Sequence, residues 1–176
     1  MKHIADLSPL PTLAESNELP AALTAGSLSA ELDDELVAYV LEAQLGFDLL
    51  RRAATLLAGL MVLAAAGVRG ARGHPMLAQA QEAAREAVDS LAAIHVPRRA
   101  AHHHLHLSRA GDALQEALRR ALESLRWNKD RLKSILPPLR ACERELHRTT
   151  AALPGFQKVS LDQACCAEAH TPLMRR

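Results

Sequence analysis

Aromatic side chains are almost missing from this sequence. They make up 2% of the 176 residues, and the whole set is Tyr39, Phe47, Trp127 and Phe156. Little aromatic surface is therefore left for stacking nucleic-acid bases. The core must come from alanine, leucine and a few valines and isoleucines. Alanine and leucine are good helix formers, and a core built from them suits helices that approach closely.

A strong excess of either charge is also missing. Lysine and arginine together number 21 and aspartate and glutamate 20, which gives a net charge of +1 with histidine neutral. The basic residues come as scattered pairs, whereas nucleic-acid binding needs a concentrated basic face. The balance of charge therefore disfavours nucleic acid as a partner.

The first residues contain no hydrophobic leader, so we predict no signal peptide. The three cysteines are odd in number, and without a leader they indicate free thiols in a reducing cytoplasm. The most apolar run, residues 53–68, holds 16 residues, while a bilayer requires about 20. We expect this run to be the most buried helix segment of a bundle, and we disfavour a membrane span.

Apolar residues recur at three- and four-residue steps from residue 29 onward, which predicts helices. The first helix should start with Ser29 as its N-cap and end in the glycine-rich segment 67–73. A second, shorter helix should begin with Pro75 at its first position and stop at Val96-Pro97.

A third helix is predicted from about residue 98 to 126, and a fourth after Asn128 as its cap. Pro137-Pro138 should break or kink the fourth helix, because proline lacks the amide donor and clashes with the preceding turn. Short connections favour antiparallel neighbours. We therefore predict an all-α, up-and-down antiparallel bundle of about four helices over residues 29–153. An extended N-terminal arm would cover residues 1–28, and a C-terminal tail residues 154–176.

The densest group of metal-ligand side chains is His102-His103-His104-Leu105-His106. On a helix, His106 lies one turn from both His102 and His103, so two imidazoles can share a divalent transition metal. Helical projection puts His103 on the apolar face, His102 and His106 at one edge of that face, and Leu105 opposite. Further donors would have to come from other helix ends, where His74, His95 and His147 are available. The alternative is a solvated first turn that carries little of the core.

A second group consists of Cys165, Cys166 and His170. Thiolates with an imidazole suit a soft or borderline metal ion, but adjacent cysteines lack the two to four intervening residues usual in zinc sites. A tail without chemical function is the competing interpretation. Cys142, on the apolar line of the fourth helix, is interpreted as a small core residue.

Phosphate-binding loops, nucleophile elbows and Glu-x-x-His pairs are all missing. We therefore predict a non-enzymatic helical bundle that acts through protein–protein contacts, as a homodimer. Leu32, Leu36 and Tyr39 on the long first helix would contribute to the subunit contact. The alternative is a metal-binding or metal-sensing bundle that uses the clustered histidines. A small helical enzyme, or haem bound through His103, are further alternatives.

Overall fold

The computed structural model describes residues 32–67, 73–123, 127–153 and 156. Its elements are α2 (Asp34–Ala65), α3 (Pro75–Ala93), a 3₁₀ turn η2 (Arg98–Ala100), α4 (Ala101–Leu122) and α5 (Lys129–Thr150). The prediction of an all-α helical bundle is confirmed. The predicted arm over residues 1–28 lies outside the described residues, as does nearly all of the predicted tail.

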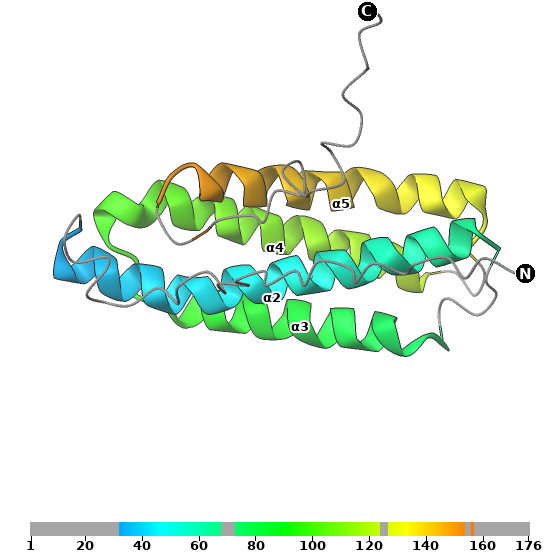
Figure 1. Ribbon diagram of the computed structural model, residues 1–176, viewed down its shortest axis with the longest axis horizontal. Helices are drawn as coiled ribbons and strands as arrows, with labels where there is room; N and C mark the ends of the chain where they lie inside the picture. The colour runs from blue at the N-terminus through cyan, green and yellow to red at the C-terminus, as the bar shows by residue number, and fades with distance from the viewer. Residues whose placement is uncertain (1–31, 68–72, 124–126, 154–155, 157–176) are drawn as a thin grey trace, which may run out of the picture.

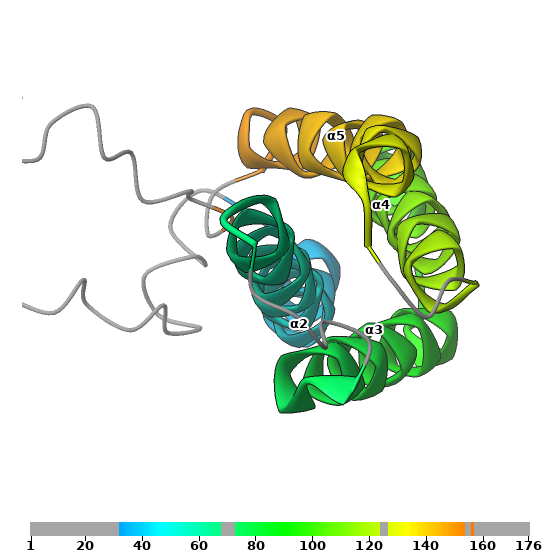
Figure 2. The same cartoon turned by 90° about the vertical axis from the view of Figure 1, so that its right-hand side faces the viewer.

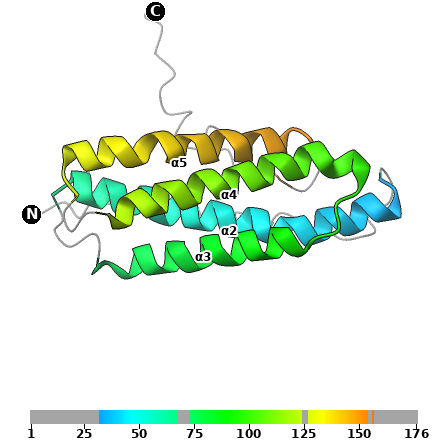
Figure 3. The same cartoon turned by 180° about the vertical axis from the view of Figure 1, so that it is seen from behind.

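The bundle consists of two helical hairpins, α2–α3 and α4–α5, that pack face to face (Figure 2). Successive helices run in opposite directions, so the chain goes up and down (Figure 1). The start of α4 therefore lies beside the end of α5, at the end of the bundle where α2 begins (Figure 3). Three segments that are far apart in the sequence meet there.

The ends of the helices follow local capping chemistry. The N-cap of α2 is Asp33, whose carboxylate accepts a hydrogen bond from the backbone N–H of Leu36 at 3.0 Å. The prediction of Ser29 as the cap is wrong, because Asp33 lies directly before the helix and supplies an equally good acceptor. After α2, Gly67 has a φ of +88°, a left-handed conformation that glycine adopts without strain. Pro75 opens α3, and Asn128 caps α5, as predicted.

Pro137 and Pro138 do not break α5, which continues through both residues, so the predicted break is wrong. A proline at position 138 leaves the carbonyl of Ser134 without its helical donor. The guanidinium of Arg120 on α4 donates to that carbonyl at 2.8 Å instead. A neighbouring helix thus replaces the hydrogen bond that proline removes.

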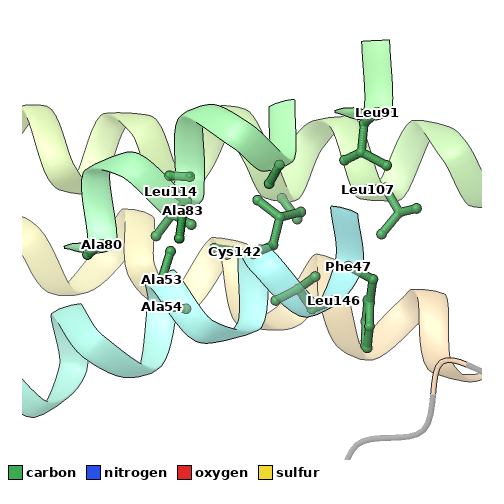
Figure 4. Close-up of a cluster of buried hydrophobic side chains, with 14 of the residues drawn as sticks. Phe47, Ala53, Ala54, Ala80, Ala83, Leu91, Leu107, Leu114, Cys142 and Leu146 are labelled. Carbon is green, nitrogen blue, oxygen red and sulfur yellow. The ribbon is translucent and has the colours of Figure 1, made fainter. Parts of the chain in front are cut away.

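The core is made mostly of alanine and leucine, as the composition predicts (Figure 4). Between α2 and α3, the side chain of Leu91 packs so closely on the backbone at Gly46 that a Cβ atom there would lie 2.6 Å from Cγ of Leu91. Ala43, Ala53 and Ala87 are fully buried on the same pair of helices. Small side chains therefore set the spacing of this hairpin.

The apolar run 53–68 is buried only in its first half. Ala53, Leu57 and Leu60 are buried, whereas Val62 is 68% exposed. The expectation that the whole run is the most buried helix segment is therefore wrong, because the last turn of α2 includes exposed side chains. In the described part of the chain, no helix combines the length and apolarity needed to cross a bilayer.

Candidate functional site

The end of the bundle where α4 begins carries most of the histidines in the described ranges, and we call it the histidine end. His102, His103, His104 and His106 occupy the first turns of α4, which follow directly from the turn η2. Because a helix advances 100° per residue, these four side chains point in different directions. They divide into an outer pair, which faces α5 and solvent, and inner rings, which face α2.

His102 and His106 form the outer pair. Their Nε2 atoms lie 3.1 Å apart, and their rings are nearly perpendicular, with an interplanar angle of 83°. Two imidazole nitrogens that bind one tetrahedral zinc ion lie about 3.3 Å apart, given Zn–N distances of about 2.0–2.1 Å. The outer pair therefore already holds two nitrogens at nearly the spacing that a shared metal ion requires.

Glu145 of α5 interacts with the second ring nitrogen of His106, Nδ1. Its Oε2 atom lies 2.5 Å from Nδ1 of His106, and its Oε1 atom accepts from Arg148 at 2.8 Å. Burial raises the pKa of the Glu145 carboxyl, but the hydrogen bond from His106 and the charge of Arg148 outweigh it, so the pKa lies below its ordinary value. An ionised carboxylate only accepts, so Nδ1 of His106 donates to Glu145, and its Nε2 atom faces His102.

The outer pair opens onto a surface hollow of about 470 Å³, lined by His102, His106, Arg148, Ala151 and Ala152. Each water molecule occupies about 30 Å³ in the liquid. The hollow thus has room for an ion and several further ligands. The two alanines at the end of α5 keep it wide.

His103 points the opposite way, into the core. It is 3% exposed, and its Nδ1 atom is hydrogen-bonded to the hydroxyl of Tyr39 at 2.8 Å. Its ring lies 4.4 Å from the ring of Phe156, measured between centroids. Its Nε2 atom has no hydrogen-bond partner among the described residues. Burial, and then the nearby His104 and His106, lower the pKa of His103 to about 4, so the imidazole is neutral near pH 7.

The remaining positions of the cluster agree with the helical projection. Leu105, predicted opposite the apolar face, is 43% exposed. His104 is half-buried against Tyr39, and burial lowers its pKa. His102 and Leu105 are exposed, as a solvated first turn would have them, but the expectation that the turn carries little of the core is wrong, because His103 and His106 are 3% and 7% exposed.

The residues that the sequence predicted to form a subunit contact pack within the chain itself. Leu36 and Tyr39 are buried in the core, and Leu32 packs against it. Leu36 and Tyr39 are 5% and 1% exposed, so neither presents a free surface to a second copy. At Leu36 and Tyr39 the apolar pattern marks the chain's own core.

The other predicted donors do not join the outer pair. His74 caps α3 at the opposite end of the bundle, where its Nδ1 atom accepts from the backbone N–H of Met76 at 3.3 Å. His95 is exposed, and its Nε2 atom lies 3.6 Å from Oε1 of Glu35. His147 is exposed on α5.

The cysteines divide between the core and the tail. Cys142 is fully buried, as predicted, and burial followed by the charge of Glu143 raises the pKa of its thiol to about 12. Cys165, Cys166 and His170 lie outside the described residues. Within the ranges that the structure describes, no three or more His, Cys, Asp or Glu side chains are grouped to hold a metal ion.

Comparison of the chain with protein-family models, with curated proteins and with solved structures gave no match. The chemistry of the histidine end must therefore be inferred from its geometry. That geometry provides two imidazole nitrogens, a carboxylate behind one of them and an open hollow in front.

Proposed function

We propose that this chain binds a divalent transition-metal ion at the histidine end, with His102 and His106 as its protein ligands. The observation that carries the proposal is the 3.1 Å separation of the two Nε2 atoms. Imidazole nitrogen is a common ligand of zinc, copper and nickel ions. The i, i+4 spacing on a regular helix holds both rings on one side without any backbone rearrangement.

The carboxylate behind His106 supports the same proposal. Metal-binding histidines usually donate their second ring N–H to a carboxylate or carbonyl, which fixes the tautomer and makes the free nitrogen more basic. Glu145 stands in that relation to His106 at 2.5 Å. A metal ion bound between the two Nε2 atoms would take the place of the proton that joins them in their hydrogen bond. His102 is exposed, so it can carry its own proton on Nδ1 in water.

The small number of protein ligands indicates an exchangeable ion. Structural zinc sites are closed by four protein ligands, whereas open sites keep positions for water or another ligand. The outer pair supplies two nitrogens beside an open hollow. A carrier or sensor of metal ions fits this arrangement better than a metal that holds the fold together. We further propose a cytoplasmic location, which agrees with the buried free thiol of Cys142.

Calorimetric titration of untagged protein with zinc chloride tests the proposal. We expect saturable binding near pH 7 and release near pH 5, because protons compete for imidazoles whose unperturbed pKa is about 6.5. The variant His102→Ala should lose this binding while the fold persists, because the side chain is exposed. His106→Ala should lose it as well.

Matched controls separate the outer pair from general histidine binding. His95→Ala removes another exposed imidazole at the same end and should leave zinc affinity unchanged. Replacing Cys165 and Cys166 with serine should also leave it unchanged. Wild-type affinity in His102→Ala would overturn the proposal.

Self-association through the exposed face of α2 is the second candidate function. Leu45 and Val62 are 55% and 68% exposed on that helix. Sedimentation of the metal-free protein over a range of concentrations tests this candidate. A dimer that the variant Leu45→Arg dissociates would support it, and a monomer at every concentration would contradict it.

A further inference from the structure

The outer pair is an incomplete set of ligands. Besides His102 and His106, the hollow is lined by Arg148, Ala151 and Ala152, whose side chains donate no electron pair to a metal ion. Glu145 already uses one carboxylate oxygen for His106 and the other for Arg148. Zinc in proteins is almost always four-coordinate when its site is closed. Two positions on the ion therefore remain for ligands from outside the described part of this chain.

A second copy of the same chain supplies the missing ligands with the right chemistry. A two-fold axis through the ion would place His102 and His106 of both copies around it, which gives four imidazole nitrogens in a tetrahedral arrangement. Each copy contributes the same surface, as an isologous contact requires. Resting on the metal binding proposed above, we propose that two copies of this chain share one metal ion through their outer pairs.

The surface around the outer pair suits such a contact. Leu105 lies one turn from His102 on the outward side of α4 and is 43% exposed. Ala151 and Ala152 are exposed beside the histidines and have little bulk to keep a second copy away. The leucine would lose its contact with water when two copies meet around the ion.

Charge makes the contact depend on the metal. Arg148 lines the hollow, and Arg109 lies exposed on α4 close enough to lower the pKa of Glu145. A two-fold axis brings the arginines of both copies near one another, which opposes association while no ligand bonds offset the repulsion. The metal-free protein should therefore be a monomer, and the ion should join two copies.

Sedimentation velocity of the full chain, with and without zinc chloride, tests this inference together with the stoichiometry from calorimetry. We expect a monomer without metal and a dimer at about half an equivalent of zinc per chain, because a shared ion serves two copies. Addition of a chelator should restore the monomer. The variant Leu105→Arg should still bind zinc but remain monomeric.

Leu45→Arg is the matched control, because it makes the same change at an exposed leucine on another helix, α2. It should form the zinc dimer like the wild type. Zinc bound at one ion per chain without dimerisation would overturn the inference and leave the proposed metal binding intact. A dimer that forms without zinc and does not change on its addition would overturn it as well. Absence of zinc binding would remove the proposed function itself.

Discussion

His103 and the outer pair, His102 and His106, lie within two turns of one helix but have opposite surroundings. His103 is buried against Tyr39 and Phe156 on the α2 side. The outer pair lies on the α5 side, where Glu145 and an open hollow complete its surroundings. The same side chain therefore serves as a neutral core residue in one place and as a candidate metal ligand in the other. What differs is the partner of the second ring nitrogen and its access to water.

The difference teaches that density of histidine in a sequence is a poor guide to a metal site. Nε2 of His103 is buried, whereas the Nε2 atoms of the outer pair face each other beside the hollow. A metal ion needs deprotonated nitrogens that face the same point and a path by which it enters. In the described part of the chain, the outer pair places two ring nitrogens toward one point beside an open hollow.

The largest effect on stability is expected when an aspartate replaces the inner His103, and it should be far smaller when an aspartate replaces the outer His102. His103→Asp should lower the free energy of unfolding by about 3–5 kcal/mol, because it leaves an unpaired charge in the core. His102→Asp should change it by less than about 0.5 kcal/mol, since the position is exposed and the first turn of a helix favours negative charge. Urea unfolding followed by circular dichroism measures both values. Equal losses would contradict the assignment of inner and outer positions.

The next largest effect is expected on acidification, which should remove the stability that the buried His103 contributes. The folded pKa of His103 is about 4, below its ordinary 6.5. Between these values the unfolded chain binds a proton that the folded chain does not. The stability contributed by His103 is therefore fully present above pH 6.5 and is lost as pH falls toward 4. The loss amounts to about 3 kcal/mol, at 1.36 kcal/mol for each pKa unit.

The double variant Tyr39→Phe, His103→Leu isolates this effect. Replacing both hydrogen-bonded partners with apolar groups is nearly neutral for stability near pH 7. Urea unfolding at a series of pH values from about 7 to 4 should show a shallower decline for the double variant than for the wild type. Parallel curves would mean that another group causes the acid sensitivity.

Much of the fold follows from patterns that the sequence displays locally. The apolar spacing of Leu107, Leu114 and Leu118 predicts the buried face of α4, and all three are buried. Pro75 and Asn128 mark their helix starts by local chemistry. The continuation of α5 through Pro138 could not be predicted in this way, because the guanidinium that donates to the freed carbonyl of Ser134 belongs to another helix.

The candidate site shows the same limit. The sequence indicates that His106 can share a metal with either His102 or His103, and periodicity does not decide between them. The choice depends on Tyr39 and Glu145, which lie 64 and 39 residues away from their histidine partners. Glu145 belongs to no recognisable motif, because a single glutamate on a helix is common in any sequence. Only the antiparallel packing of α4 on α5 brings it to His106.

The smallest effect is expected at Glu145, which supports the outer pair without touching the ion. The variant Glu145→Gln keeps an oxygen that accepts from His106, so metal-free stability should change by less than about 1 kcal/mol. Zinc affinity should fall about tenfold, or about 1.4 kcal/mol, because the neutral amide makes the imidazole less basic and fixes its tautomer less firmly.

Two controls identify Glu145 as a positioning residue. Glu143→Gln makes the same change at an exposed site on α5 and should leave zinc affinity unchanged. Glu145→Asp keeps the negative charge on a shorter side chain, so it should recover part of the affinity that the amide loses. Calorimetric titration of the three variants at constant pH and salt gives these values. If Glu145→Gln binds zinc as tightly as the wild type, the carboxylate merely neutralises Arg148, and the outer pair binds its ion without support from α5.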